Sequence, residues 1–193
     1  LFESFTELLN GRINYVSRDE RMNNEVQMKE VLGKLGFGTA QVLEMGEESI
    51  EFEKVPGIDG FIFLSGASEL ESRSIGQEIG DFLYELHSED VAINDFRLSN
   101  IHVSDSLELY YLDHEYSKLE ANPLIKKIDQ LTLFSSARQT GGFSSFLEGF
   151  KQSKTDVDYL ALIASIFVFG YHALLFERDV NKFFRGMKSI TVY

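Results

Sequence analysis

The amino-acid sequence predicts an α+β fold with small sheets and a mainly helical second part. Apolar residues recur at helical spacing over residues 74–88, which is typical of an amphipathic helix. Two short runs with period-two alternation follow at residues 101–103 and 107–111 and are joined by a polar turn, which is typical of a β-hairpin. The 193 residues are enough for one large domain or two small lobes.

The N-terminal part contains an ambiguous segment followed by a helix. Residues 1–18 fit either a helical stripe or two poor strands around Asn10 and Gly11. A helix is expected over residues 19–35, because apolar side chains recur there at helical spacing and Gly36 follows as a stop signal.

Two strands are expected next, at residues 40–45 and 49–54, around a turn that contains Gly46. Apolar and acidic residues alternate in the second strand, so one of its faces should be buried. Loop-like composition then extends over residues 55–73, which we interpret as a hinge. The chain is therefore expected to consist of a partial N-terminal lobe, residues 1–57, and a larger C-terminal lobe, residues 58–193.

The C-terminal lobe is expected to be mainly helical. Besides the helix at 74–88, helices are predicted at residues 124–137, 143–151, 156–176 and 180–187. The apolar run 159–176 meets the minimum length of a membrane span, but it contains His172 and acidic residues flank it. We therefore expect a buried helix and no membrane span.

Charge and cysteine content exclude several functions. The formal net charge of −13 argues against nucleic acid as a partner, because polyanions are bound by clustered Lys and Arg. No Cys is present, so neither disulfides nor thiolate metal sites are possible. No signal-peptide pattern begins the chain. We expect a cytoplasmic protein.

The stretch 91–100 and the hairpin after it carry the candidate chemistry. Asp95 and Arg97 lie in the presumed loop, Asn100 enters the first strand of the hairpin, and Asp113 leaves the second. Because hairpin strands are antiparallel and about 5 Å apart, Asn100 and Asp113 should lie side by side. Asp95 should lie one loop away.

These side chains suit phosphoryl transfer. Mg²⁺ prefers hard oxygen ligands, so Asn100 and Asp113 are candidate metal ligands. Asp95 could accept a hydrogen bond from a substrate hydroxyl and orient it for attack. Arg97 could neutralise charge on a transferring phosphoryl group, or it could simply form a local salt bridge with Asp95; both interpretations remain open.

The spacing Asp95-x-x-x-x-Asn100, followed by a hairpin and then Asp113, resembles that of the protein-kinase-like superfamily. The resemblance implies a two-lobe fold in which the C-terminal lobe carries a catalytic β-hairpin and the N-terminal lobe is incomplete. It also implies ATP and Mg²⁺ as cofactors, Asp95 as the catalytic aspartate, and Asn100 and Asp113 as the Mg²⁺ ligands. Arg97 takes the place of a residue that contacts phosphate.

The same resemblance assigns roles outside the loop. Glu25 corresponds to the helix glutamate that pairs with an ATP-holding lysine. Glu53 and Val55 lie where the last strand of the N-terminal lobe enters the hinge, whose main chain would hold adenine. Asp129 is similar to the aspartate that braces the catalytic loop from a following helix.

Within the superfamily, the chain resembles small atypical members: RIO-like or KEOPS-associated kinases, lipopolysaccharide-core kinases, and aminoglycoside or choline phosphotransferases. The segment between Asp113 and Asp129 is short, and Asp113-His114-Glu115 is similar to the Asp-aromatic-Glu of small-molecule phosphotransferases. Phe146-Leu147-Glu148-Gly149-Phe150 is similar to a Phe-Leu-x-Gly-Tyr segment of the same groups.

Three features depart from the superfamily pattern. Ile93 replaces the usual histidine, no glycine-rich loop is visible, and no lysine precedes Lys29. The ATP-clamping lysine is therefore expected either upstream of Leu1 or lost.

The sequence thus predicts an ATP- and Mg²⁺-dependent phosphotransferase acting on a hydroxyl of a small molecule, sugar or protein serine. The alternative is a pseudokinase that serves as a binding or regulatory module.

Overall fold

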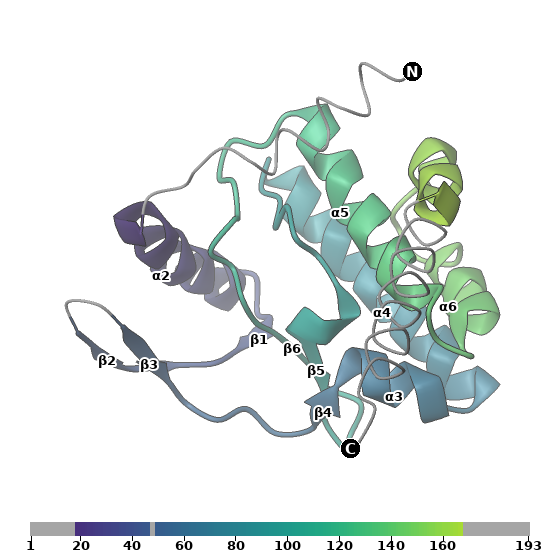
Figure 1. The fold of residues 1–193 in the computed structure, drawn as a ribbon, viewed down its shortest axis with the longest axis horizontal. Helices are drawn as coiled ribbons and strands as arrows, with labels where there is room; N and C mark the ends of the chain where they lie inside the picture. The colour runs from purple at the N-terminus through teal and green to yellow at the C-terminus, as the bar shows by residue number, and fades with distance from the viewer. Residues whose placement is uncertain (1–17, 47–48, 168–193) are drawn as a thin grey trace, which may run out of the picture.

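The computed structural model describes residues 18–46 and 49–167. This part of the chain folds into helices and two small sheets (Figure 1), which confirms the α+β fold class. The helices are α2 (Arg18–Lys34), α3 (Gly60–Gly66), α4 (Glu69–Ser88), α5 (Pro123–Ala137) and α6 (Phe143–Phe150), with a 3-10 turn η1 (Leu98–Asn100). The strands are β1 (Gly38–Thr39), β2 (Val42–Met45), β3 (Ile50–Phe52), β4 (Ile58–Asp59), β5 (Ile101–Val103) and β6 (Leu109–Tyr111).

The predicted hairpin lies at the centre of the larger sheet. Its four strands have the order β1-β6-β5-β4, with β5 antiparallel to both β6 and β4. Strand β1 pairs with β6 in parallel, so residues on both sides of the expected lobe boundary share one sheet. The division of the chain at residue 57 stays a prediction.

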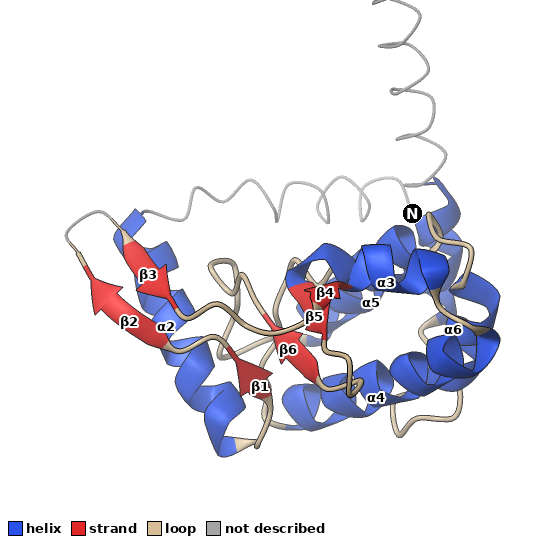
Figure 2. Ribbon diagram, turned by 90° about the horizontal axis from the view of Figure 1, so that it is seen from below, coloured by secondary structure: helices blue, strands red, loops and turns tan. Residues whose placement is uncertain are grey.

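Strands β2 and β3 form a separate antiparallel ribbon. Figure 2 shows this ribbon beside α2, whereas β4, β5 and β6 lie among the helices α3, α4 and α5. The ribbon therefore extends away from the main helical body.

The loop expected over residues 55–73 is wrong, because most of this segment is regular structure. Its role as a hinge stays a prediction. Asp59 caps α3, its Oδ1 accepting hydrogen bonds from the backbone N–H groups of Phe61 (2.7 Å) and Ile62 (3.2 Å). Ser68 and Glu71 then form a capping box, which starts α4 at Glu69. In the sequence, Asp59 is visible as a polar residue directly before an apolar run, and Ser68 with Glu71 shows the Ser-x-x-Glu pattern of a capping box.

The other elements within the described residues agree with expectation to within a few positions. The structure confirms the helices expected at 19–35, 124–137 and 143–151 and the strands expected at 40–45, 49–54, 101–103 and 107–111. Of the helix expected at 156–176, residues 159–167 are helical and the rest lies outside the described residues, as do residues 1–17 and the helix expected at 180–187. No helix in the described ranges is long and apolar enough to cross a membrane.

An aromatic stack joins α4, the loop before η1 and the hairpin. The ring of Phe82 lies 3.7 Å from that of Tyr111 and 5.5 Å from that of Phe96, measured between centroids. All three side chains are buried in the main core. Large buried rings in stacked contact stabilise their surroundings, so the loop that contains Phe96 is anchored in the core.

Helices α4 and α6 approach closely at two glycines. A Cβ atom at Gly76 would lie 2.1 Å from the carbonyl oxygen of Phe146 on α6, and one at Gly149 would lie 1.8 Å from that of Arg73 on α4. Neither position tolerates a side chain without moving a backbone. This contact holds α6 against the helix that leads into the loop.

Candidate active site

The hairpin brings Asn100 and Asp113 to the same end of the sheet. Ile101 pairs with Tyr111, and the N–H of Leu112 donates a 2.8 Å hydrogen bond to the carbonyl oxygen of Asn100. Asp113 is the next residue, and its φ of 59° turns the chain out of the strand direction. The predicted juxtaposition of these two residues is therefore present.

Asp95 joins this group through the backbone. The side-chain Nδ2 of Asn100 donates a 3.1 Å hydrogen bond to the carbonyl oxygen of Asp95. Asp95, Asn100 and Asp113 thus lie at one place, although the sequence separates the first from the last by a whole hairpin. Their catalytic and metal-binding roles stay predictions.

Asp129 on α5 holds the loop from beneath. Its Oδ1 accepts a 2.6 Å hydrogen bond from the N–H of Asn94, and its Oδ2 accepts one of 3.1 Å from the N–H of Ile93. Nε2 of His87, at the end of α4, lies 2.9 Å from Oδ2. Burial of this carboxyl, which is 0% exposed, raises the pKa of Asp129, while the hydrogen bonds from His87 and the loop oppose the rise.

The brace expected from Asp129 is thus present, and His87 is part of it. Ile93 stands where the superfamily pattern has a histidine, so the loop lacks that polar side chain. In the folded chain a different histidine, His87 from α4, contacts the Asp129 carboxylate. The loop also contacts α5 through Thr132, whose hydroxyl donates to the carbonyl oxygen of Phe96 at 3.0 Å.

Arg97 forms a two-pronged ion pair with Asp95. Its Nε and Nη2 donate to the two carboxylate oxygens at 2.7 Å and 2.8 Å. The Arg97 side chain is 47% exposed and that of Asp95 is 15% exposed. The local salt bridge, one of the two interpretations left open by the sequence, is therefore the arrangement observed.

Negative charges surround Asp113. Partial burial raises the pKa of the Asp113 carboxyl, and the charges of Glu115, Glu25 and Asp95 raise it further, whereas Arg97 lowers it. A cation near Asp113 would relieve this repulsion. The side-chain oxygens of Asn100 and Asp113 are also hard donors of the kind that Mg²⁺ prefers, so the donor set fits this ion.

A cavity of about 570 Å³ opens beside Asp113. Its walls come from α2, from β3 with the segment after it, and from the end of the hairpin. Of the residues predicted to form the site, Glu25, Glu53, Val55 and Asp113 line the cavity. Asp95, Arg97 and Asn100 do not line it; they lie next to it, on the side of Asp113.

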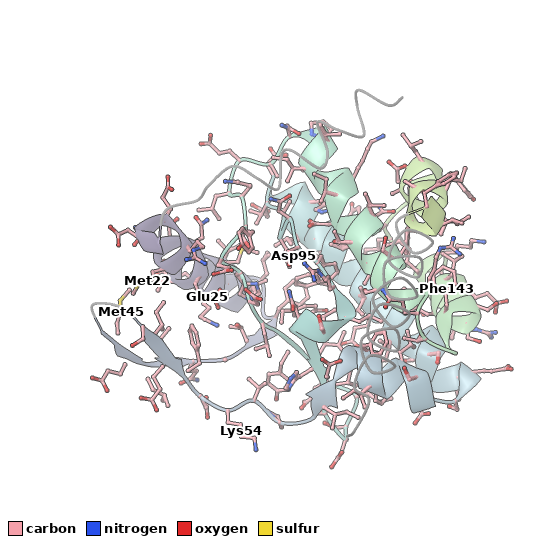
Figure 3. The ribbon with its side chains drawn as sticks, in the orientation of Figure 1. Met22, Glu25, Met45, Lys54, Asp95 and Phe143 are labelled. Carbon is pink, nitrogen blue, oxygen red and sulfur yellow. The ribbon has the colours of Figure 1, made fainter. Side chains whose placement is uncertain are left out.

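Glu25 connects α2 to the residue after Asp113. Its side chain is 7% exposed, and Figure 3 places it on the side of α2 that faces the rest of the molecule. One carboxylate oxygen accepts a hydrogen bond of 2.5 Å from the N–H of His114. The other lies 3.3 Å from Nζ of Lys29, one helical turn further along α2.

Our sequence interpretation missed Lys29, because it sought a lysine upstream of Glu25 on a separate strand. Lys29 lines the cavity. The signal for a pair was present in the sequence as Glu and Lys four residues apart, a spacing that places two side chains on one helix face. That this face lies toward the cavity could not be read from the spacing.

His114 fills a buried position behind the site. Its Nε2 lies 3.0 Å from the carbonyl oxygen of Tyr111. Burial, together with the charge of Lys29, lowers the pKa of His114 to about 3, so the imidazole is neutral and donates this hydrogen bond. Its role in the structure is packing beneath the turn at Asp113.

Within the described part of the chain, no group of three or more His, Asp or Glu side chains is placed to hold a metal ion. A site made of one amide and one carboxylate, as predicted for Asn100 and Asp113, is too small to form such a group. Water and ligand phosphates commonly complete a Mg²⁺ shell of this kind.

Comparisons with known proteins found similarity to a solved structure but not to a family model or a curated protein. No protein-family model matches the sequence, and no curated protein matches it. The structure of the Cydia pomonella granulovirus kinase PK-1 is similar at a TM-score of 0.49 with 14% sequence identity, covering 68% of this chain. The match spans 56% of that kinase, little more than half its length.

Such a likeness by itself carries no argument about activity. The small sheets, the helices and the central hairpin show the α+β class expected from the sequence, and the protein-kinase-like arrangement stays a prediction. The narrower resemblance to RIO-like, lipopolysaccharide-core or aminoglycoside kinases stays a prediction.

Proposed function

We propose that this protein is an ATP- and Mg²⁺-dependent phosphotransferase that moves the γ-phosphate to a hydroxyl of a small molecule, a sugar or a protein serine. The observation that carries the proposal is the position of Asp113. This carboxylate lines the cavity and shares one end of the hairpin with Asn100 and Asp95. A nucleotide in the cavity would therefore have its phosphates beside two hard oxygen ligands and a second carboxylate.

Each residue has a distinct role in the proposed reaction. Asn100 and Asp113 hold Mg²⁺, which when bound neutralises charge on the nucleotide phosphates. Asp95 accepts the proton of the acceptor hydroxyl as its oxygen bonds to the γ-phosphorus and the bond to the bridging oxygen of ADP breaks. Glu53 and Val55 lie in the wall that would receive the adenine.

Arg97 controls access to Asp95 in this scheme. Its guanidinium donates to both carboxylate oxygens, so it competes with an acceptor hydroxyl for Asp95. Because Arg97 is largely exposed, it is free to turn toward a transferring phosphoryl group and neutralise its charge. A cytoplasmic location, where ATP is abundant, fits this activity.

The proposal is tested by nucleotide binding and transfer measured on the same samples. Calorimetry should detect ATP binding that requires Mg²⁺, and mass spectrometry of a panel of hydroxyl acceptors should detect a phosphorylated product. Asp95→Asn should lower the transfer rate by about 10²–10⁴-fold, the usual contribution of a general base, while ATP affinity changes little. Asp105→Asn, in the exposed hairpin turn, is the matched control. Absence of ATP binding by the wild-type chain would overturn the proposal.

One observation favours a second candidate, a pseudokinase that binds nucleotide without transferring phosphate. The Arg97 fork pairs with both carboxylate oxygens of Asp95. If this pairing is what prevents transfer, ATP should bind, the wild-type chain should phosphorylate no acceptor, and Arg97→Ala should restore transfer. Transfer by the wild-type chain would exclude this candidate.

A further inference from the structure

Lys29 is a buried cation in the wall of the cavity. Its side chain is 9% exposed, as is that of Glu25, its partner on the same helix. Nζ lies 3.3 Å from Oε1 of Glu25, donates a 3.2 Å hydrogen bond to Oγ1 of Thr39, and lies 4.3 Å from the ring centroid of Phe52. An ammonium group kept this far from water requires such partners.

These partners do not use all of its hydrogen-bonding capacity. An ammonium group has three N–H donors. Within the described residues, Glu25 and Thr39 take two, and the Phe52 ring attracts the charge without accepting a conventional hydrogen bond. One donor therefore remains for a ligand in the cavity that Lys29 lines.

The other basic residues of the lining are placed differently. Arg21 is paired with Glu115, at 3.2 Å. Lys54 is exposed, and Figure 3 shows its side chain directed outward from the chain. Lys29 is thus the basic lining residue whose charge is held inside the cavity wall.

A chain of contacts fixes Lys29 relative to Asp113. Glu25 holds Lys29 with one oxygen and the N–H of His114 with the other, and His114 follows Asp113 directly. A cation bound at Asp113 and the ammonium of Lys29 would therefore flank the same space. One positive group at each side of this space suits a polyphosphate, which carries several negative oxygens in a row.

We propose that Lys29, a residue of α2 itself, binds a phosphate oxygen of the nucleotide in this cavity. The inference rests on the proposed function and adds the residue that holds the phosphates. It makes a lysine from a strand upstream of Glu25 unnecessary, because the helix supplies both the carboxylate and the cation. Glu25 is then a positioning residue that orients Lys29 and the turn at Asp113.

The test compares two ligands that differ only in their phosphates. Affinities of ATP with Mg²⁺ and of adenosine are measured by calorimetry for wild type, Lys29→Gln and Lys34→Gln. Lys34 ends the same helix and is exposed, so it is the matched control. We expect Lys29→Gln to weaken ATP binding about tenfold or more, as expected for the loss of a charge-assisted hydrogen bond, with adenosine affinity unchanged.

Other outcomes separate this inference from the proposed function. Equal weakening of ATP and adenosine binding would assign Lys29 a purely structural role, and unchanged ATP binding would remove it from the site. Either result overturns the inference while wild-type ATP binding still supports the proposed function. Absence of ATP binding by wild type overturns the proposed function first.

A second measurement needs no variant and covers the case in which Lys29→Gln does not fold. Wild-type protein is treated with an amine-acetylating reagent, and modification of Lys29 and Lys34 is quantified by mass spectrometry. ATP with Mg²⁺ should protect Lys29 several-fold more than adenosine does, without protecting Lys34. Equal protection of Lys29 by both ligands, or by neither, would contradict phosphate binding.

Discussion

Two regions near the cavity are built differently: the loop at residues 91–100, which lies next to the cavity, and the ribbon of β2 and β3, whose strand β3 lines it. On one side, six of the ten residues in the loop at 91–100 are buried, with Phe96 stacked in the core and Asp129 accepting hydrogen bonds from the loop backbone. On the other side, every residue of β2 is exposed, and β3 contributes only the half-buried Ile50 and Phe52. Each strand of the ribbon has one partner strand, and the ribbon lies beside α2 (Figure 2), where Lys29 contacts the ring of Phe52.

The loop and the ribbon meet two different requirements of a binding site, fixed reacting groups and an entrance for the ligand. Groups that react need fixed positions, and buried hydrogen bonds together with aromatic packing fix the loop. A wall that admits a ligand needs less stability, and elements with few buried contacts open more easily. We therefore expect changes on the loop side to affect stability and reaction together, and changes on the ribbon side to affect ligand binding with little loss of stability.

The largest expected effect on stability comes from replacing a phenylalanine by alanine, once in the loop and once in the ribbon. Phe96→Ala should lower the free energy of unfolding by about 3–5 kcal/mol, because it removes a buried ring from a close-packed stack. Phe52→Ala should lower it by about 1 kcal/mol, since the ring is half-exposed and loses mainly its contact with the Lys29 ammonium.

Urea denaturation measures both variants. Leu43→Ala, at an exposed position of β2, controls for loss of apolar surface on the ribbon. If Phe96→Ala and Phe52→Ala lower the free energy of unfolding by similar amounts, the loop and the ribbon are equally stable, which would contradict the expected difference.

A medium effect is expected when the brace beneath the loop is altered. Asp129→Asn keeps the shape of the side chain but turns one of its two acceptor atoms into a donor. It should cost about 1–3 kcal/mol, because a buried backbone N–H of the loop loses its partner. Hydrogen exchange at the amides of Ile93 and Asn94 should become faster.

Asp105→Asn provides the surface control for this brace, and its stability should stay within about 0.5 kcal/mol of wild type. Unchanged amide exchange at Ile93 and Asn94 in Asp129→Asn would mean that the loop is held by its aromatic packing alone.

The smallest expected effect concerns charge at Asp113. Its pKa is raised in the folded chain, so the folded state holds the proton more readily than the unfolded chain does. The stabilisation present at low pH is lost as the pH rises from the ordinary value of 3.8 through the raised value. Asp113→Asn should therefore melt at a slightly higher temperature than wild type at pH 7, by about 1–2 °C, because Asp113 is exposed and water screens the repulsion.

Differential scanning calorimetry at several pH values checks this difference. The gap between Asp113→Asn and wild type should narrow as the pH falls toward 4, and Mg²⁺ should raise the melting temperature of wild type alone. A gap that does not depend on pH would assign the effect to packing instead of charge.

Local patterns were sufficient for the elements on which the candidate site depends. The period-two runs identified the hairpin, and antiparallel pairing alone placed Asn100 beside Asp113. The loop predicted at residues 55–73 was wrong because composition was used without the local capping signals. Its composition is typical of loops, but the caps at Asp59 and Ser68 start helices there, and those caps outweigh average composition.

Contacts between distant residues could not be predicted in the same way. Asp129 on α5 contacts His87 at the end of α4 and the backbone of Ile93 in the loop, so three separate segments meet at one carboxylate. The Glu25–Lys29 pair has a visible local spacing, yet its importance depends on which face of α2 lies toward the cavity. For Arg97 the sequence left open a phosphate contact or a salt bridge with Asp95. The structure shows the salt bridge, and the fold of the loop is what brings the two side chains together.

The sequence by itself therefore determined the α+β class, the hairpin and the meeting of an amide with a carboxylate at its open end, because these follow from short-range periodicity and strand geometry. The tertiary structure alone decided which cation lies in the cavity and which carboxylate and imidazole hold the loop. Those choices depend on burial, where an unpaired charge is costly, and burial is set by packing among segments that lie far apart in the chain.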